Sequence, residues 1–533
     1  MQSLVLFLAV LLAGIQVICS YTDPGDSAAL QSLKATWQNT QPSWEKDDPC
    51  GAPWDGVTCN DSRVSALSLS TRNIAGSLSG NIGSPTELIS LDLSFNRELT
   101  GPLVPQLGDL QKLTTLILAG CGFTGEIPDE LSKLSNPVFL ALISDNYFVG
   151  SLPPSLGKLS QLFWLDLAGN QFSGTIPVST DSAPGLDLLL DAKHFRLNKN
   201  LFSGSIPEKL FSADMKLTHL VLDNNQLSGP IPSTLGLVLT LEVLRLDNNS
   251  FSGEVPASLN NLVNVIELNL AYNSLTGLFP DLSKMESHTF VDLSNNYFSP
   301  TDVPDWLSNL PWLSTLIVEN GSLQGPLPKE LFSSPELPFV KLRNNAINGT
   351  LNMSSNISRN LELANLRYNQ ISLVETNSSE YANTLVLLGN PVSNNSLANT
   401  SYCQPPQQPA TSNYSTSLAH CGNNSCPHNQ MLSPQSCNCA FPYQGKLYFK
   451  APSFREINVT LFQDLEESLR TGLDLAPHSV FLENPFFNID NYLEVQVALF
   501  PSPGNQFNGS EITRIGLDLS SQICKPPQQL GPY

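Results

Sequence analysis

The stretch Leu162-Phe-Trp-Leu-Asp-Leu-Ala-Gly-Asn-Gln-Phe-Ser-Gly-Thr-Ile-Pro177 is one copy of the unit L-x-x-L-x-L-x-x-N-x-F-x-G-x-I-P. The unit recurs roughly every 24 residues through most of the chain, which predicts a repeat protein. Leu165 and Leu167 alternate with outward-facing residues, and this period of two predicts a short strand with its leucines inward. A single unit cannot bury its leucines, so the copies must stack into a solenoid.

The other fixed positions of the unit each have a structural reason. Asn170 at the bend can satisfy backbone groups of the neighbouring coil, and Phe172 and Ile176 return to the core. Gly174 and Pro177 are turn residues. Alignment on the strand leucines predicts thirteen or fourteen repeats within residues 64–395, with starts near Val64, Leu88, Leu113, Val138, Leu162, Ala192, Leu217, Leu241, Val265, His288, Leu313, Leu337, Leu361 and Ala382.

One repeat is longer than the rest, because Ser179 to Leu190 adds residues before the unit that starts at Ala192. Insertions in repeat proteins map to loops on one face, often the binding face. The insertion is therefore a candidate ligand contact, with tolerated loop variation as the alternative.

Composition narrows the function. The net charge is -21, with 26 Lys and Arg among 533 residues. Phosphate binding requires clustered cations, so this balance argues against a nucleic-acid partner. The length exceeds one ordinary core, but each unit of a solenoid contacts only its neighbours, so we expect few domains.

The N-terminus predicts secretion. Residues 4–18 form an apolar run followed by small residues, too short to span a bilayer comfortably, which predicts a cleaved signal peptide over residues 1–20. Extracellular exposure is also indicated by thirteen N-x-S/T glycosylation sequons, at Asn60, Asn248, Asn320, Asn348, Asn352, Asn356, Asn377, Asn394, Asn399, Asn413, Asn423, Asn458 and Asn508.

The chain has ten cysteines, and nine remain once Cys19 leaves with the signal peptide. An odd number leaves at least one thiol unpaired within a single chain. Cys121 is the candidate, because it occupies the bend asparagine position of its repeat, where a buried thiol is inert. Six cysteines follow the repeats and allow fifteen connectivities, at Cys403, Cys421, Cys426, Cys437, Cys439 and Cys524.

A cap over residues 21–63 should cover the first repeat, because the ends of a solenoid expose apolar surface. Ser27 to Trp37 predicts an amphipathic helix, and Cys50 and Cys59 are close enough to predict a local disulfide. The motif D-P-C-x-x-x-W-x-G-V-x-C in Asp48 to Cys59 resembles the N-terminal cap of plant leucine-rich-repeat receptors. The G-x-I-P ending of the repeats is similar to the plant-specific repeat class.

The outward strand positions form an open face. Its early repeats carry apolar residues that mark a partner site, at Phe95, Phe139, Leu142, Phe163 and Trp164. Basic residues follow at His194, Arg196, Lys199, His219, Arg245, Lys341, Arg343 and Arg367. Lys341 and Arg343 lie two apart on one strand, so they either hold a ligand carboxylate together or balance nearby acidic residues. A similar basic pair reads a peptide C-terminus in plant peptide receptors.

The repeat spacing stops near Asn395, and residues 396–444 form a cysteine-rich junction. Its C-x4-C and C-x-C spacings miss the usual zinc pattern, and a secreted chain oxidises its thiols. Structural disulfides and redox-responsive cysteines therefore stay as the alternatives, and His420, His428 and Lys446 are near enough in sequence to favour a thiolate.

Residues 445–533 predict a compact α+β unit. Strands are expected over residues 446–450, 479–482 and 492–500, and helices over residues 459–470 and 510–518. The first helix depends on an apolar stripe at helical spacing, and the last strand on alternation in Tyr492-Leu-Glu-Val-Gln-Val-Ala-Leu. A β-α-β-β-α order packs as a sheet with helices on one face.

The C-terminal part carries a more specific resemblance. Cys437-Asn-Cys-Ala-Phe-Pro-Tyr-Gln-Gly, Ser479-Val-Phe-Leu-Glu-Asn-Pro485, Asp490-Asn-Tyr-Leu-Glu-Val495 and the ending Gly531-Pro-Tyr533 resemble the membrane-proximal region of the subfamily VIII leucine-rich-repeat receptor-like kinases. That group includes receptors linked to perception of hydrogen peroxide and quinones. The resemblance implies redox-responsive roles for Cys421, Cys426, Cys437 and Cys439. Cys403 and Cys524 are separately expected to be bridged.

These observations predict an α/β solenoid of the plant leucine-rich-repeat horseshoe type, followed by a small α+β membrane-proximal domain. The resemblance implies the ectodomain of a plasma-membrane receptor kinase, whose transmembrane helix and kinase would follow Tyr533. This chain itself is expected to have no catalysis, cofactor or metal. The expected partners are an extracellular oxidant, peptide or small ligand and a leucine-rich-repeat co-receptor. A ligand-binding ectodomain without redox sensing and a secreted inhibitor are the alternatives.

Overall fold

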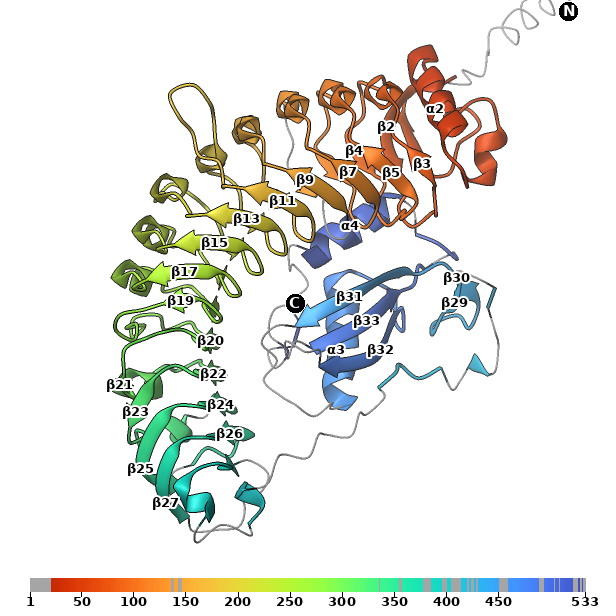
Figure 1. Ribbon diagram of the computed structural model, residues 1–533. Helices are drawn as coiled ribbons and strands as arrows, with labels where there is room; N and C mark the ends of the chain where they lie inside the picture. The colour runs from red at the N-terminus through yellow and green to blue at the C-terminus, as the bar shows by residue number, and fades with distance from the viewer. Residues whose placement is uncertain are drawn as a thin grey trace, which may run out of the picture. The chain divides into compact units, whose positions relative to one another are not determined.

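The structure is a computed structural model, shown in Figure 1. It describes residues 21–135, 139–141, 146–334, 336–353, 357–376, 385–394, 400–403, 414–418, 421–422, 426–427, 430–449, 459–487, 493–502, 504–507, 509–520, 526–527 and 530. The predicted signal peptide and Cys524 lie outside these residues. The chain divides into two compact units, residues 1–173 with 179–189 and residues 174–178 with 190–533.

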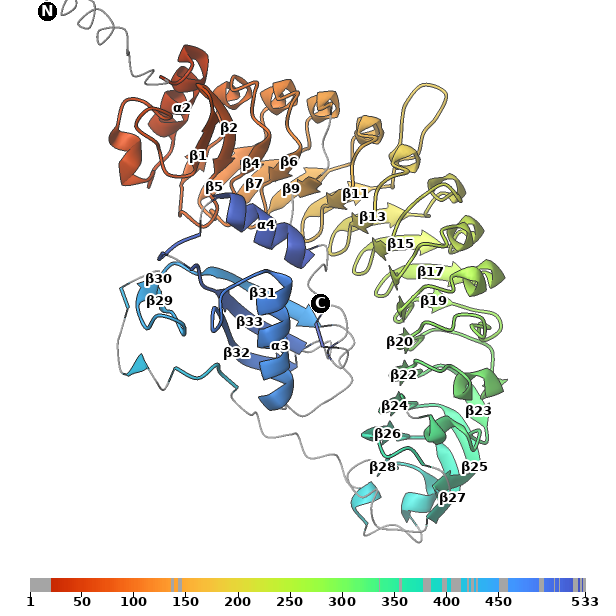
Figure 2. The same cartoon turned by 180° about the vertical axis from the view of Figure 1, so that it is seen from behind.

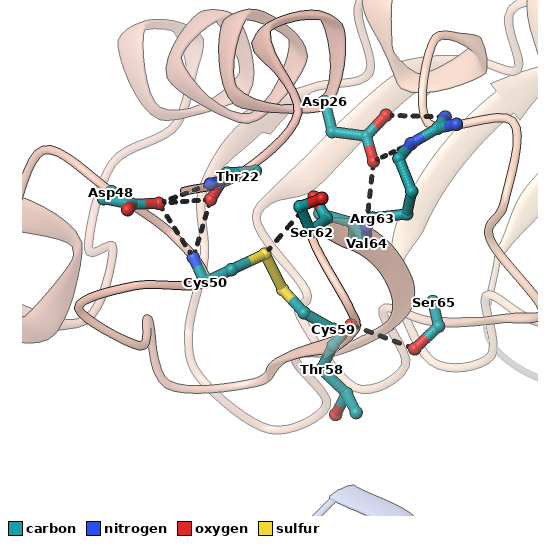
Figure 3. The surroundings of a disulfide bond; sticks show 10 residues. All are labelled: Thr22, Asp26, Asp48, Cys50, Thr58, Cys59, Ser62, Arg63, Val64 and Ser65. Atoms are coloured by element: carbon teal, nitrogen blue, oxygen red, sulfur yellow. Dashed lines mark hydrogen bonds and ion pairs between the residues drawn. A yellow bond between two sulfur atoms is a disulfide. The ribbon is translucent and has the colours of Figure 1, made fainter. Parts of the chain in front are cut away.

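The first unit begins with the predicted cap, which consists of α2 (Pro24–Thr36), η1 (Pro42–Glu45) and β1 (Val57–Asn60). The indole rings of Trp44 and Trp54 stack with their centroids 4.6 Å apart, beneath the helix. The disulfide between Cys50 and Cys59 is formed as predicted (Figure 3). Strand β1 then pairs antiparallel with the first repeat strand, so the cap completes the edge of the repeat sheet.

Each repeat contributes one strand to a parallel sheet, and most described repeats add a second short strand and a 3-10 turn. In the first unit these are β2 (Arg63–Ser68), β3 (Gly76–Ser77), η2 (Gly80–Gly83), β4 (Ser90–Asp92), β5 (Leu99–Pro102), η3 (Pro105–Asp109), β6 (Thr115–Ile117), β7 (Gly122–Gly125), η4 (Asp129–Lys133), β8 (Phe139–Ala141), β9 (Tyr147–Gly150), η5 (Pro154–Lys158), β10 (Trp164–Asp166), β11 (Gln171–Gly174) and η6 (Leu186–Leu188). The strand leucines are buried, as the period of two predicts.

The second unit continues the same pattern. Its elements are β12 (His194–Arg196), β13 (Leu201–Gly204), η7 (Glu208–Leu210), β14 (His219–Val221), β15 (Gln226–Gly229), η8 (Ser233–Leu237), β16 (Val243–Arg245), β17 (Ser250–Gly253), η9 (Ala257–Asn261), β18 (Glu267–Asn269), β19 (Ser274–Leu275), β20 (Phe290–Asp292), β21 (Thr301–Asp302), η10 (Asp305–Ser308), β22 (Thr315–Ile317), β23 (Leu323–Gly325), η11 (Leu331–Ser333), β24 (Phe339–Lys341), β25 (Ala346–Met353), β26 (Leu363–Asn365), β27 (Gln370–Thr376), β28 (Leu385–Val386), η12 (Pro391–Asn394) and η13 (Ser401–Cys403). The even-numbered strands from β12 to β28 lie side by side in one sheet, in the same order as in the chain, and each pairs with the next in parallel.

The bend asparagine of most described repeats satisfies backbone groups of two coils at once. The Asn273 amide donates to the carbonyl oxygens of Leu246 and Leu270 at 3.0 and 3.1 Å, and its Oδ1 accepts from the Phe251 amide at 3.0 Å. Leu246 and Phe251 belong to the preceding coil, so this side chain joins the two repeats. The same pattern recurs at Asn96, Asn146, Asn225, Asn249, Asn296, Asn345, Asn369 and Asn390.

Cys121 takes the asparagine position of its repeat. Its thiol is free and 2% exposed, and Sγ lies 3.2 Å from the carbonyl oxygen of Leu93 in the preceding coil. Burial raises the pKa of this thiol to about 12. The side chain therefore stays a neutral thiol at physiological pH, which agrees with the predicted inert role.

After the repeats, seven elements form the α+β region: β29 (Met431–Leu432), β30 (Cys439–Ala440), β31 (Tyr443–Phe449), α3 (Val459–Gly472), β32 (Val480–Phe487), β33 (Leu493–Leu499) and α4 (Gly509–Ser520). The antiparallel sheet has the order β31-β33-β32, and α3 lies across one of its faces (Figure 2). The apolar stripe of α3 is buried against it, including Phe462 and Leu465. The repeats and this antiparallel sheet confirm the predicted fold class.

Replacing Asn273 tests the asparagine contribution. Asn273→Ala leaves a buried amide and two buried carbonyls without these partners, and an unsatisfied buried group costs about 1–3 kcal/mol. We therefore expect a loss of roughly 3–5 kcal/mol in the local unfolding free energy, measured by hydrogen exchange of the two adjoining repeats. Asn264→Ala is the control, because its amide bonds the Leu239 carbonyl at an exposed site. Equal losses in both variants would contradict the assignment.

Candidate functional site: the open strand face and the cysteine hairpin

The apolar part of the open face is smaller than predicted. Phe95 and Phe163 are 52% and 37% exposed, but Trp164 is 2% exposed. The prediction that Trp164 is an exposed contact residue is therefore wrong, because its side chain is buried. Parallel strands lie about 4.8 Å apart, so wide side chains in the same column pack against one another. Phe139 is the register partner of Trp164 on β8, but its side chain and Leu142 lie outside the described part of the structure.

Two of the predicted basic residues are buried histidines. His194 on β12 and His219 on β14 are register partners, and their rings meet edge to face with centroids 4.5 Å apart. Burial, together with the positive charges of Arg196 and Lys193, lowers the pKa of His194 to about 3. His194 is therefore neutral at pH 7 and adds no positive charge to the open face.

Arg245 on β16 is surrounded by carboxylates. Its guanidinium nitrogens lie 3.0 Å from Asp247 Oδ2, 3.5 Å from Asp223 Oδ1 and 3.8 Å from Glu267 Oε1. We call these four residues the Arg245 cluster. The stretch that was expected to be basic is therefore acidic around Arg245, because carboxylates from the adjoining repeats lie beside it. The sequence offered a signal, since Asp223 and Asp247 hold the same position in consecutive repeats.

The second basic group has a carboxylate partner within the chain. Lys341 ends β24, and Arg343 follows two residues later. Arg343 Nη2 lies 3.0 Å from Glu319 Oε2, and both side chains are partly exposed. This ion pair corresponds to the second expectation for the pair, in which basic residues balance acidic neighbours. A ligand carboxylate at Arg343 would have to compete with Glu319.

The insertion is a closed loop on the turn side of the repeats. It follows β11 and includes η6, and the Asp187 carboxylate accepts hydrogen bonds from the Ser179 amide and hydroxyl, each at 2.5 Å. Because the strands of the open face lie elsewhere in the repeat, this position favours loop variation over contact with a ligand on that face.

Four cysteines of the junction form two interleaved disulfides, Cys421 to Cys437 and Cys426 to Cys439. Cys421 is buried, and the other three are half-buried. Cys439 begins β30, which pairs with β29 as a short hairpin, the cysteine hairpin. The pairing resolves a connectivity that the sequence left open.

The cysteine hairpin shares a small core with the α+β sheet. Ala440 packs with Phe481, Ala498 and Phe500 on the face of the sheet opposite to α3 residues, and Met431 lies at its edge. The state of the two disulfides is therefore coupled to the sheet through direct packing.

Cys403 differs from its expected bridge. It is a free, buried thiol whose Sγ lies 2.7 Å from Ser393 Oγ at the end of the repeats. Cys524, the other cysteine expected to be bridged, lies outside the described residues.

The described sequons are mostly accessible. Asn60, Asn248, Asn320, Asn348 and Asn394 are exposed, and Asn352 is half-buried. The positions of Asn356, Asn377, Asn399, Asn413, Asn423, Asn458 and Asn508 lie outside the described residues. Exposure leaves the five amides sterically open to glycosylation, which stays a prediction.

Among the described residues, none of the helices has the length and apolar character needed to cross a bilayer. The same residues include no group of three or more His, Cys, Asp or Glu side chains placed to hold a metal ion.

Sequence comparisons match both the cap and the repeats. A family model described as leucine rich repeat N-terminal domain matches residues 23–60, and one described as Leucine Rich Repeat matches residues 112–134, 216–237 and 240–262. A probable leucine-rich repeat receptor-like protein kinase of Arabidopsis thaliana is 42% identical over 526 residues, 97% of this chain and 55% of the relative. Protein STRUBBELIG-RECEPTOR FAMILY 1 of the same plant is 36% identical over 118 residues, 22% of this chain and 15% of the relative.

Solved plant receptors have similar structures. A crystal structure of PEPR1-AtPEP1 has a TM-score of 0.57 and 26% identity, covering 68% of this chain and 55% of that one. The LRR ectodomain of the Arabidopsis thaliana receptor kinase GASSHO1/SCHENGEN3, in complex with CASPARIAN STRIP INTEGRITY FACTOR 2, has a TM-score of 0.55 and 31% identity, covering 68% of this chain and 50% of that one.

Together, the repeat fold and the matched models define a leucine-rich-repeat protein. The comparisons show that this chain is similar to an LRR receptor-like kinase and to the solved LRR ectodomain of a plant membrane receptor kinase. The chain spans 55% of the length of the receptor-like kinase from Arabidopsis thaliana.

Removing one bridge tests the role of the cysteine hairpin. Cys426 and Cys439 are 13 residues apart, and a loop of this size contributes about 3 kcal/mol in the chain-entropy model. We expect Cys426→Ser/Cys439→Ser to lower the stability of the α+β region by roughly 2–4 kcal/mol and to leave the repeats unchanged, as measured by hydrogen exchange. A matched variant, Cys121→Ser, tests for general effects of cysteine replacement. Loss of protection in the repeats alone would reject the coupling.

Proposed function

We propose that the chain is the extracellular sensing domain of a plasma-membrane LRR receptor-like serine/threonine kinase of subfamily VIII. The main support is that a receptor-like kinase aligns over 97% of this chain, including the α+β region beyond the repeats. A secreted inhibitor needs the repeats but gives the α+β region no purpose. In a receptor, the α+β region has a role as the part next to the membrane.

The continuation of the native transcript tests the receptor proposal. The coding sequence after Tyr533 is expected to specify an apolar segment of about 20 residues and then a kinase domain. A fluorescent fusion of the full-length product is expected at the plasma membrane, with the tag at its C-terminus inside the cell. A stop codon directly after Tyr533 and recovery of the protein as a secreted, soluble product would favour the inhibitor alternative.

The open strand face is the proposed ligand surface. PEPR1 and GASSHO1/SCHENGEN3 are solved with AtPEP1 and CASPARIAN STRIP INTEGRITY FACTOR 2, respectively, and both resemble this chain in fold. By that analogy a peptide or small ligand contacts the exposed Phe163 and the half-buried Lys341. We also propose that a co-receptor completes the complex. Trp164 follows Phe163 in the chain but is buried, and Phe139 is its register partner on β8. Arg343 stays a contact only for a carboxylate that displaces Glu319.

Redox sensing at the cysteine hairpin is the second candidate. It is favoured by two disulfides packed into one short segment, with three half-buried cysteines. Hydrogen peroxide oxidises two thiols to one disulfide and is reduced to two waters, and a quinone does so while becoming a hydroquinone. Both bridges are already formed here, so a thiol reductant such as glutathione must first open one of them.

Alkylation and mass spectrometry test the redox candidate on the secreted ectodomain. Cys426 and Cys439 are expected to be alkylated when the reagent follows equilibration with reduced glutathione, and to escape alkylation when hydrogen peroxide re-forms the disulfide before the reagent is added. Cys50 and Cys59 provide the internal control and are expected to stay bridged throughout. The sensing role is rejected if Cys421, Cys426, Cys437 and Cys439 all remain bridged in the presence of glutathione, or if peroxide does not change the extent of their alkylation.

A further inference from the structure

The Arg245 cluster contains more buried carboxylates than cations. It spans three adjacent parallel strands, β14, β16 and β18, and contains one guanidinium and three carboxyl groups. The four side chains are at most 4% exposed. If every group is ionised, two negative charges are left over away from solvent. Such charges are costly unless a partner neutralises them.

Two carboxylate oxygens of the Arg245 cluster make no hydrogen bond within the described chain, Glu267 Oε1 and Asp223 Oδ1. Both oxygens face Arg245 Nε, but at 3.8 and 3.5 Å, which is too long for a good hydrogen bond. The opposite oxygen of Asp223 does have a donor, the Asn224 amide at 2.7 Å. Buried polar atoms are normally hydrogen-bonded, so these two point to a missing positive ligand.

Burial restricts what that ligand can be. An organic ammonium or guanidinium group needs space and access, which side chains exposed by at most 4% do not provide. A metal ion needs converging ligands, and the described residues contain no such group. A proton needs neither space nor coordination geometry. It neutralises one carboxylate and converts an acceptor oxygen into a hydrogen-bond donor.

We propose that the Arg245 cluster is a proton-binding site on the open face, which loads in mildly acid surroundings. The proton comes from water and is carried by a carboxylate oxygen, so the step needs no other reactant. The proposal goes beyond the sensing function proposed above and does not depend on the identity of any ligand. It makes the charge of the open face a function of extracellular acidity.

The pKa values of the carboxyl groups agree with this site. The pKa of Asp247 is raised to about 6, first by burial and then by the charges of Asp223 and Glu267, while Arg245 opposes the rise. On the next strand along, β20, burial raises the pKa of Asp292 to about 6, and Asp247 adds to it.

Other titratable groups near these strands act in different directions. Lys341 lowers the pKa of Asp292 slightly, and His219 lies on β14 beside His194. Burial lowers the pKa of His288, at the start of the β20 repeat, to about 4 and that of His194 to about 3. A histidine whose pKa is lowered in the folded protein destabilises the fold as the pH falls below the pKa of that histidine in the unfolded chain. This effect opposes that of the carboxyl groups.

The sign of the carboxyl effect follows from linkage. The folded pKa of Asp247 is about 6 and its ordinary value is 3.8, so the folded cluster holds a proton between these values that the unfolded segment has lost. Its contribution to stability is therefore present near pH 5 and declines as the pH rises through 6. Comparing a variant with the wild type cancels the opposing histidines, because both proteins contain them.

Hydrogen exchange of β14, β16 and β18 at pH 5.0 and 7.5, corrected for intrinsic rates, tests the site in the full chain. Asp247→Asn mimics the protonated group permanently. At pH 7.5 we expect the protection factors of this variant to exceed those of the wild type. The ratio of variant to wild-type protection is expected to fall roughly tenfold between pH 7.5 and pH 5.0, since one pKa unit corresponds to a tenfold change. Asp214→Asn, at an exposed position, is the matched control and should give the same ratio at both values.

Glu267→Gln provides a second variant that removes one like charge and keeps the shape. This substitution is expected to raise protection at pH 7.5 and to reduce the dependence of protection on pH. If the cluster were an ordinary structural ion pair, the same substitution would lower protection at pH 7.5. The proposal is overturned if Asp247→Asn and Glu267→Gln keep the wild-type pH dependence, or if both lower protection at pH 7.5. Neither result bears on whether a kinase follows Tyr533, so the receptor proposal is tested separately.

Discussion

The whole repeat region depends on one constraint, the need to hydrogen-bond the backbone groups that each coil leaves open at its bend. A side chain such as Asn273 meets that need for its own coil and for the preceding one. Hydrophobic burial alone would allow neighbouring coils to slide, because leucine contacts are not directional. The amide fixes the register, and this register then places the outward residues of successive strands in columns. Every feature of the open face follows from those columns.

The same dependence explains how far the sequence could predict the structure. The repeats, the cap and the α+β elements each have a local pattern, either a period or a short motif, so Leu165 or Phe462 could be placed from nearby residues. The open face has no such local rule. Trp164 and Arg245 were expected to be an exposed contact and a free positive charge, but their surroundings come from residues one repeat away. Only an alignment of columns across repeats, with charges summed, would have found the Arg245 cluster.

The cysteine pairing was beyond sequence reasoning for a related reason. Fifteen connectivities fit the spacing of six cysteines, and the choice depends on the hairpin that packs on the sheet through Ala440 and Phe481. The open face and the cysteine hairpin thus hold two different kinds of chemical group, a cluster of carboxyl groups around Arg245 and a pair of disulfides. Each lies on a rigid element, so a change in charge or pairing is passed to well-packed neighbours.

The interleaving of the two disulfides has a consequence for the response of this chain to a protease that cuts between the cysteines. Because Cys421 joins Cys437 and Cys426 joins Cys439, a single cut between Cys426 and Cys437 leaves the two pieces held together by both bridges. A cut between Cys421 and Cys426, or between Cys437 and Cys439, still leaves one bridge across the break. A nick in this segment would therefore go unnoticed in a gel run without reductant, and the repeats would stay covalently attached to the α+β region.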